Sequence, residues 1–276
     1  MLSEITGKDN SRLKHARAVR DGRIAEKIFI EGLRLAEEGA KSNLKFTDFF
    51  FTPEFALTAR GSNLVRNLQN QNLRAASVSE KLLASIAETK TPQGIVVLAK
   101  KPASDKADLE NVLSTKNNPL LVILNRLNNP SNIGAILRTA EAAGVAATIL
   151  TENTADVFSP KALRGSMGSA FRLPLWTNAP FDEAMDFCRY HEIKVVCAEL
   201  GARKTHTEID WTKSKALMIG SEAHGLTAEE ISQTDESLKI PMNFSVESLN
   251  ATVACGIVLF EAVRQRFAAS GSWFET

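Results

Sequence analysis

The chain has few of the residues that mark disulfide-bonded or metal-binding proteins. Among 276 residues there are three cysteines, an odd number without a CxxC pair: Cys188, Cys197 and Cys255. Such a set supports neither a disulfide framework nor a zinc site, so we expect reduced, buried cysteines. The four histidines are also scattered, without the spacing of two ligands on one helix face. We therefore expect no protein-bound metal.

Long apolar runs are missing as well. The longest stretches, such as 120–124 and 253–259, are much shorter than the roughly 20 apolar residues that cross a bilayer. The first residues include an acid, Glu4, and no apolar block, so they resemble neither a secretory signal nor a transit peptide. These absences predict a cytoplasmic protein without a membrane span.

Two common enzyme signatures are also missing. The turn that contains Gly220 and Gly225 is not the GxGxxG of a nicotinamide-binding βαβ unit. The segment 165–168, Gly-Ser-Met-Gly, is not a GxSxG nucleophile elbow, and no apolar strand precedes it. The pattern therefore argues against a nicotinamide-dependent oxidoreductase and against a serine hydrolase.

Neither charge is in strong excess. The 33 basic residues nearly balance the 32 acidic ones, and a net charge of +1 does not decide whether the protein binds nucleic acid. The most basic segment is 8–27, which contains Lys8, Arg12, Lys14, Arg17, Arg20, Arg23 and Lys27. Two interpretations stay open for it: a solvated helix face that covers an apolar one, or a surface that contacts phosphates.

The length and the patterning indicate two α/β domains. The polar stretch around 101–117 separates them, so we expect a substrate-binding domain at 1–100, a linker at 101–117 and a second domain at 118–276. In the first, strands are expected at 28–30, 48–52 and 94–99, and helices at 32–41 and 63–69.

The second domain alternates more clearly between strands and helices. Strands are expected at 120–124, 145–150, 193–198, 216–219 and 238–240, and helices at 133–143, 181–191, 227–233 and 248–267. This alternation predicts a mostly parallel sheet with helices on both faces. Ligands of such sheets bind beside loops at the carboxyl ends of strands, which directs attention to the loops after Leu124, Ile219 and Ile240.

Polar residues and glycines occupy all three loops. In the first, Asn132 is expected to cap the following helix. Gly134 lets another backbone segment or a ligand approach closely, and the Arg138 side chain must reach solvent or meet an anion. In the third, Ser248 and Asn250 precede a long apolar helix, whose free N–H groups bind polar or anionic ligands. Each loop alone is explained equally well by turn and cap formation.

Taken together and in this order, the three loops resemble the SpoU, or TrmH-like, branch of the SPOUT RNA methyltransferases. We name them the motif-one segment (125–138), the motif-two segment (217–226) and the motif-three segment (240–250). The matching residues are Asn132, Gly134 and Arg138 in motif one, Gly220, Glu222 and Gly225 in motif two, and Ile240-Pro241-Met242 with Ser248-Leu249-Asn250 in motif three.

The resemblance implies a fold and a partner. It implies a C-terminal domain with a trefoil knot, a homodimer, and an N-terminal α/β domain similar to ribosomal protein L30e. The N-terminal landmarks are 29–32, Phe-Ile-Glu-Gly, and 91–94, Thr-Pro-Gln-Gly. The chain departs from the family at Asn125 and Asn129, where many relatives carry Asp, which removes acidity near the site.

The resemblance also implies an activity: methyl transfer from S-adenosylmethionine to a ribose 2′-hydroxyl of structured RNA, with 23S ribosomal RNA and a guanosine favoured. The expected cofactor contacts are Gly220, Ile240 and Leu249, with Met242 as an addition. Because a guanidinium stays protonated in proteins and can only donate, we expect Arg138 to hold the nucleotide's phosphate. The full set of expected catalytic residues is Asn132, Arg138, Glu222, Ser248 and Asn250.

Three alternatives remain at this point. The substrate is transfer RNA instead of ribosomal RNA, the methyl acceptor is a base, or the chain is a non-catalytic RNA-binding or ribosome-assembly factor. The motif-three sequence Ser248-Leu249-Asn250 favours the ribose branch over base methylation. The presence of Asn132, Arg138 and Glu222 together argues against a protein that only binds RNA. The 2′-hydroxyl distinguishes RNA from DNA, so no DNA partner is expected.

Overall fold

A computed structural model of the chain forms two compact units. Unit 1 comprises Met1–Pro102 and Phe158–Arg172, and unit 2 comprises Ala103–Val157 and Leu173–Thr276. A short segment from the C-terminal half of the sequence thus groups with the N-terminal unit. The structure describes residues 2–42, 44–71, 73–243 and 245–271.

Unit 1 contains a five-stranded sheet in the order β1-β4-β3-β5-β2. Strand β5 runs antiparallel to both of its neighbours, whereas β1, β4 and β3 are parallel. The strands are β1 (Leu2–Ile5), β2 (Lys27–Glu31), β3 (Phe46–Phe51), β4 (Arg74–Val78) and β5 (Ile95–Lys100). The helices are α1 (Ser11–Arg20), α2 (Leu33–Lys41), α3 (Pro53–Leu57), α4 (Ala59–Gln69), α5 (Glu80–Ile86), α8 (Pro160–Ser166) and α9 (Ser169–Arg172).

Apolar periodicity explains how unit 1 packs. Phe49 and Phe50 are fully buried because β3 lies inside the sheet, where both of its faces are covered. Helix α1 buries Leu13, Ala16 and Val19, at spacings of three residues, in the core beside the sheet. The three strands and two helices expected between 28 and 99 are all present, with bounds that differ by a few residues.

Unit 2 contains a seven-stranded sheet whose strands are all parallel. The strand order is β10-β12-β9-β11-β6-β7-β8. The strands are β6 (Leu120–Leu124), β7 (Ala147–Thr151), β8 (Leu175–Ala179), β9 (Lys194–Ala198), β10 (Lys204–Thr205), β11 (Lys215–Ile219) and β12 (Glu236–Lys239). The expected parallel sheet is confirmed, and β8 and β10 are additional strands.

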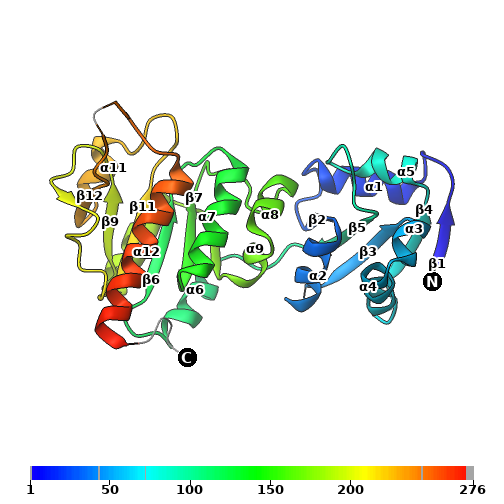
Figure 1. Ribbon diagram of the computed structural model, residues 1–276, viewed down its shortest axis with the longest axis horizontal. Coiled ribbons are helices and arrows are strands. Elements are labelled where there is room, and N and C mark those ends of the chain that lie inside the picture. The colour runs from blue at the N-terminus through cyan, green and yellow to red at the C-terminus, as the bar shows by residue number, and fades with distance from the viewer. Residues whose placement is uncertain (1, 43, 72, 244, 272–276) are drawn as a thin grey trace. The chain divides into compact units, whose positions relative to one another are not determined.

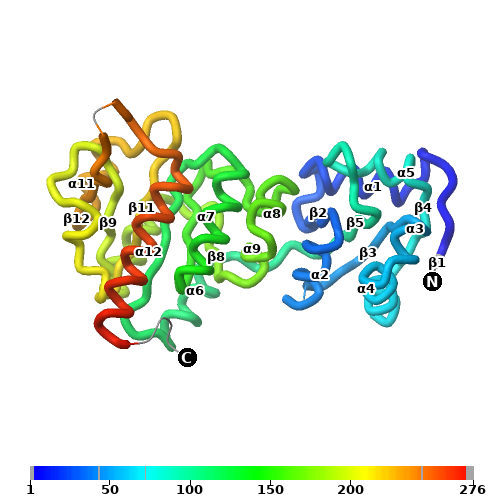
Figure 2. The backbone as a smooth tube through the Cα atoms, viewed as in Figure 1, coloured from blue at the N-terminus to red at the C-terminus, as the bar shows by residue number. Residues whose placement is uncertain are grey.

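Helices cover both faces of this sheet. Helices α6, α10 and α11 share an apolar core with alternate residues of the strands, such as Leu121 and Met218. On the opposite face α7 packs against α12, which also contacts β11, as Figures 1 and 2 show. The helices are α6 (Lys106–Leu113), α7 (Pro130–Ala142), α10 (Phe181–Tyr190), α11 (Ala228–Ser232) and α12 (Ala251–Ser270).

The start of α7 differs from the expected one. The helix begins at Pro130 and its N-cap is Asn129, whose side chain accepts from the backbone N–H of Ser131 at 3.0 Å. Proline at the first helical position suits this start, because its missing N–H would be unpaired there in any case. The expectation that Asn132 caps the helix is therefore wrong. Its side chain, inside the first turn, is available for other contacts.

Helix α12 begins at Ala251, three residues after the expected start at Ser248. Asn250 is the N-cap, and its side chain accepts from the N–H of Thr252 at 2.9 Å. Ser248 lies two residues before the cap and is exposed. The helix ends at Ser270, and its C-cap is Gly271, whose φ of 71° is the left-handed conformation typical of a glycine at that position.

The polar stretch 101–117 is not a bare connector. It contains α6, which has a complete capping box at Asp105 and Asp108 and buries Leu109 and Leu113 in unit 2. In the part of the chain that the structure describes, no helix is both long and apolar enough to span a membrane. The trefoil knot implied by the resemblance stays a prediction.

Candidate active site

The motif-one and motif-two segments leave the sheet side by side. Their strands, β6 and β11, are neighbours, and Leu124 pairs with Ile219 at the carboxyl end of both. One residue further, the N–H of Asn125 donates to the carbonyl of Ile219 at 2.9 Å. The chain passes from β6 to β7 on one side of this pair and from β11 to β12 on the other side. The connections that leave β6 and β11 therefore diverge at this point of the sheet. Such a point is where open parallel sheets bind their ligands.

Asn132 connects all three motif segments. Its Nδ2 donates to Oε1 of Glu222 at 3.0 Å, and its Oδ1 accepts from Nδ2 of Asn250 at 3.3 Å. The Thr252 hydroxyl, in the first turn of α12, donates to the backbone carbonyl of Asn132 at 3.4 Å. Three of the five expected catalytic residues therefore lie in one hydrogen-bonded cluster.

Glu222 holds the motif-one segment through its backbone as well. One carboxylate oxygen accepts from the N–H of Asn128 at 3.0 Å and the other from the N–H of Asn129 at 3.3 Å. Partial burial raises the pKa of Glu222, but these N–H donors and the Asn132 amide outweigh it, so the pKa lies below its ordinary value. The carboxylate is consequently ionised near neutral pH.

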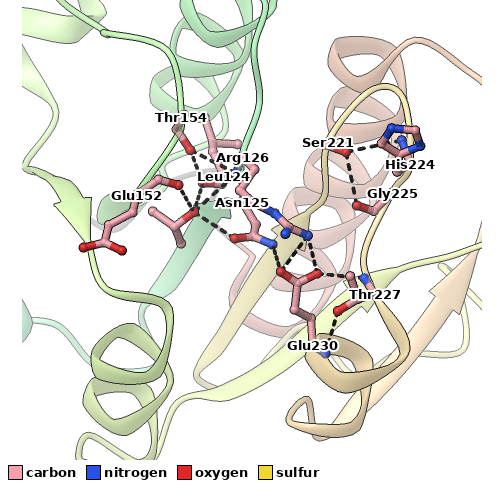
Figure 3. A network of polar contacts seen from close by, with 11 residues as sticks. Leu124, Asn125, Arg126, Glu152, Thr154, Ser221, His224, Gly225, Thr227 and Glu230 are labelled. Atoms are coloured by element: carbon pink, nitrogen blue, oxygen red, sulfur yellow. Dashed lines mark hydrogen bonds and ion pairs between the residues drawn. The ribbon is translucent and has the colours of Figure 1, made fainter.

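The motif-two segment folds back on itself directly after β11. The N–H of Gly225 donates to the carbonyl of Ser221 at 2.9 Å, and the Ser221 hydroxyl lies beside Gly225 and His224 (Figure 3). A Cβ on Gly220 would lie 2.6 Å from the carbonyl carbon of Gly225, closer than side chains come to backbone atoms. Only glycine therefore fits at position 220 without opening the turn.

The motif-three segment lies between β12 and α12, and its described residues, 240–243 and 245–250, form no regular secondary structure. Three apolar side chains in it are half-buried, namely Ile240, Met242 and Leu249, whereas Ser248 is exposed. The segment reaches the cluster through Asn250. The cofactor contacts of its apolar residues and the catalytic role of Ser248 stay predictions.

Arg138 lies apart from this cluster. It is exposed on α7, six residues after Asn132, and no residue in the described parts of the chain forms a hydrogen bond or ion pair with it. Of the two outcomes expected from the sequence, its guanidinium reaches solvent. It is therefore available to an anion that comes from outside this chain's described residues.

Sequence reasoning missed a second polar network beneath the loops. Asn125, which was noted only as a departure from the family pattern, is buried and donates to Glu230 of α11 at 2.8 Å (Figure 3). One signal was available, because Thr227 and Glu230 have the spacing of a capping box, and the structure forms that box. The pairing of this box with Asn125 has no local sequence signal.

A parallel α/β sheet with polar loops gathered at its carboxyl edge is typical of enzymes that bind a small ligand there. Residues 119–260 match the model of the SpoU rRNA Methylase family, and residues 10–97 match that of the MRM3-like substrate binding domain. The chain belongs to the SpoU rRNA methylase family, which confirms the resemblance drawn from the three motifs.

Curated relatives span most of the chain. An uncharacterized tRNA/rRNA methyltransferase of Synechocystis is 30% identical over 98% of this chain and 96% of its own length. The 23S rRNA (guanosine-2′-O-)-methyltransferase RlmB of Pasteurella multocida is 34% identical over 78% of this chain and 90% of its own. The 23S rRNA (guanosine(2553)-2′-O)-methyltransferase RlmP of Bacillus subtilis is 31% identical over 84% and 87%.

Solved structures share the whole architecture. The AdoMet-bound rRNA methyltransferase of Sinorhizobium meliloti superposes with a TM-score of 0.84 at 27% identity, covering 95% of this chain and 98% of that one. The SpoU methyltransferase AviRb of Streptomyces viridochromogenes, in complex with AdoMet, gives a TM-score of 0.82 at 27% identity, covering 94% and 99%. The predicted fold class, a helix-covered parallel sheet with a smaller N-terminal α/β unit, is thus confirmed.

Proposed function

We propose that this chain transfers a methyl group from S-adenosylmethionine to a ribose 2′-hydroxyl of structured RNA in the cytoplasm, with a guanosine of 23S ribosomal RNA as the preferred acceptor. The observation that carries the proposal is the cluster in which Asn132 contacts both Glu222 and Asn250. It gathers the three segments that define the family at the edge of the sheet where a ligand is expected. Relatives named as guanosine-2′-O-methyltransferases support the acceptor.

The loops fit the methyl donor. Gly220 brings two stretches of backbone together without a side chain, and backbone groups suit the polar parts of a nucleoside. The half-buried side chains of Ile240, Met242 and Leu249 offer apolar contacts to an adenine ring. S-Adenosylmethionine supplies an activated methyl group on a sulfonium, so the reaction requires neither a metal ion nor a covalent enzyme intermediate.

The protein's task is then to orient and activate the hydroxyl. A ribose hydroxyl is a poor nucleophile near neutral pH, so in-line alignment and stabilisation of developing negative charge carry the rate. The Arg138 guanidinium can only donate, and we assign it to the target nucleotide's phosphate, with the proton leaving to phosphate or water. Asn132 and Asn250 orient the loops and the ribose, Glu222 fixes Asn132, and Ser248 is exposed for contact with the substrate.

A homodimer is part of the proposal. Helix α12 exposes Val253, Ile257 and Phe260 by 50%, 37% and 51%, and their spacing of four and three residues puts them on one helix face. Apolar stripes of this kind on a helix that is packed on its other side mark protein interfaces. We propose that a second copy covers this stripe. Arg138, which has no partner in the described chain, then serves a site completed by two copies.

Unit 1 is proposed to select the RNA, as the match to a substrate binding domain suggests. Its basic segment is partly engaged inside the unit. Arg12 pairs with the buried Asp48, and Arg20 and Arg23 pair with Asp21. These contacts occupy those three arginines within the unit, whereas Lys14, 58% exposed and paired at 3.5 Å with the exposed Asp9, is the residue that we assign to phosphate contact.

The test uses the full chain, labelled methyl donor, and ribosomal or transfer RNA that lacks the modification. We expect label in 23S RNA, recovered after nuclease digestion as a 2′-O-methyl nucleoside. Label in transfer RNA would replace the proposed substrate, and label on a base would replace the proposed acceptor. A folded chain that bound RNA but not the donor would instead identify a non-catalytic RNA-binding factor.

A further inference from the structure

A buried amide and a buried carboxylate meet beneath the motif segments. Asn125 follows β6 directly and is 1% exposed. Its Nδ2 donates to Oε1 of Glu230 at 2.8 Å (Figure 3). Its Oδ1 accepts from the hydroxyl of Thr151, at the end of β7, at 2.8 Å. Both polar atoms of the Asn125 amide are therefore satisfied, one by α11 and the other by β7.

Donors surround the carboxylate of Glu230. Its Oε2 accepts from the N–H of Thr227 at 2.7 Å and from the guanidinium of Arg126 at 2.8 Å. Burial raises the pKa of Glu230, but the Thr227 N–H, the Asn125 amide and the Arg126 charge together bring it below its ordinary value. The arrangement is thus an ionised carboxylate that needs a donor, and not an acceptor, at position 125.

The same network holds a strained residue. Arg126 has a φ of 57°, the left-handed conformation that a residue with a side chain seldom adopts. Its N–H donates to the hydroxyl of Thr154 at 3.0 Å and to that of Thr151 at 3.3 Å. Such a conformation is energetically unfavourable and persists only where the surroundings impose it. Here it turns the chain toward Asn128 and Asn129, whose N–H groups bind Glu222.

Two carboxylates therefore bind the motif-one segment at separate points. Glu222 binds it between Asn128 and Asn132, and Glu230 binds its beginning through Asn125 and Arg126. Both carboxylates follow β11 in the sequence. The relative position of the motif-one and motif-two segments thus depends on both contacts.

We propose that Asn125 and Glu230 are a positioning pair that aligns the motif-one segment with the motif-two segment, and that the pair functions only as one amide and one carboxylate. The consequence for methyl transfer rests on the proposed function, whereas the pairing itself does not. In Asn125→Asp a carboxylate oxygen would lie 2.8 Å from Glu230. Two like charges at that distance cannot both ionise, so one would retain a proton near neutral pH.

The charged groups around the pair set the direction of this effect. Arg126 faces Glu230, and Figure 3 shows the carboxylate of Glu152, after β7, directed away from it. His224 lies in the motif-two segment beside Ser221. Arg126 lowers the pKa of a carboxyl beside it, but it already neutralises Glu230 and cannot balance a second charge. Asn125→Asp should therefore loosen the motif-one segment as the pH rises.

The experiment measures amide hydrogen exchange of residues 125–132 in the full chain at pH 5.5 and pH 8. After correction for the intrinsic rate, we expect exchange in Asn125→Asp to be wild-type-like at pH 5.5 and about tenfold or more faster at pH 8. Asn125→Asp/Glu230→Gln restores the amide–carboxylate complement with the roles exchanged, and should be wild-type-like at both. Asn111→Asp, the same change on the exposed side of α6, is the matched control and should change nothing.

Either of two results overturns the proposal: exchange in Asn125→Asp that does not depend on pH beyond the wild type, or a double variant no better than the single one. If Asn125→Asp unfolds at pH 8, recovery of the fold at pH 5.5 and in the double variant is the same expected rescue. Calorimetric affinity for S-adenosylmethionine is measured in parallel and should weaken only where exchange is fast. Wild-type chain that ignores this donor would refute the proposed function, while the exchange result still decides the pairing.

Discussion

The amide of Asn132 lies 3.0 Å from the carboxylate of Glu222, although 90 residues separate them in the sequence. The contact exists because β6 and β11, which precede these two residues, are neighbours in the sheet. It is the link between the first two motif segments, and Asn250 adds the third. The predictions below test this cluster, the residues around it and the assembly it requires.

Replacing the carboxylate in the cluster should weaken the site without unfolding it. In Glu222→Gln one oxygen remains for the N–H groups of Asn128 and Asn129, but the charge that strengthens these bonds is lost. We expect donor affinity to fall about tenfold, in line with the loss of a charged hydrogen bond. Calorimetry measures it, with Glu229→Gln, an exposed carboxylate of α11, as the control. Unchanged affinity would show that Glu222 is not part of the binding site.

Arg138 should govern turnover and not donor binding. Its guanidinium is exposed and forms no hydrogen bond or ion pair with a described residue, so Arg138→Ala breaks no polar contact among those residues. We expect turnover to fall by about 10²–10³-fold, as when a charge-stabilising donor is removed, with donor affinity within a few fold. Arg138→Lys should recover little, because an ammonium cannot bind a phosphate through two parallel N–H groups. Normal turnover in the alanine variant would reject the phosphate role.

A methyl group at position 220 should open the motif-two turn. The Cβ of Gly220→Ala would lie 2.6 Å from the carbonyl carbon of Gly225. Moving the backbone to relieve this clash costs stability. We expect donor binding to be lost while the melting temperature falls by only a few degrees, since the turn is exposed at the sheet edge. Gly201→Ala, where a Cβ meets nothing closer than 3.8 Å, should keep wild-type affinity. Equal affinity of the two variants would contradict the assignment.

A charge in the stripe on α12 should dissociate the dimer. Phe260 is half exposed within the stripe, so Phe260→Glu changes the proposed interface without opening the core. Sedimentation should show a dimer for the wild type and a monomer for this variant, with turnover lost in parallel if two copies complete one site. Leu57→Glu alters an apolar side chain of unit 1 that is 86% exposed, and should remain dimeric. A monomeric wild type would end the proposal of shared sites.

Acid should unfold unit 2 through its ion pairs. Burial raises the pKa of Glu236, but Lys204 and Lys215 outweigh it and bring the pKa below the ordinary 4.5. A lowered folded-state pKa stabilises the fold fully above pH 4.5, and this contribution disappears as the pH falls below that value. Glu236→Gln should lower the melting temperature near pH 7 by roughly 5 °C, because Lys215 stays buried without its partner. Below pH 4.5 the melting temperature of this variant should fall less steeply with decreasing pH than that of the wild type. Thermal unfolding measured over a series of pH values checks this.

Features with a local cause could be predicted well. The run 120–124 forms a strand over those same residues, because five consecutive apolar side chains suit a strand that is covered on both faces. The order and spacing of the three motif segments were sufficient to identify the family. Asn250 was expected at the start of the last helix, and it caps that helix.

Features that depend on residues far away in the sequence could not be predicted. Asn132 was assigned to the helix cap, but Asn129 takes that place and frees Asn132 for Glu222. Asn125 was noted only as a departure that removes acidity near the site, and only its burial against Glu230 shows why an amide suits the position. No property of residues near 125 in the chain indicates a carboxylate that lies 105 residues away.

The sequence alone therefore determined the alternation of strands and helices and the residue types at the site, because both follow from local composition and spacing, and the resemblance of its three motifs to a known family indicated the class of protein. The tertiary structure decided which of those residues meet. It placed β11 beside β6, and with it set Glu222 against Asn132 and Glu230 against Asn125. Strand order is a property of the whole sheet, since it minimises the exposed apolar surface of all strands together, and no single segment encodes it.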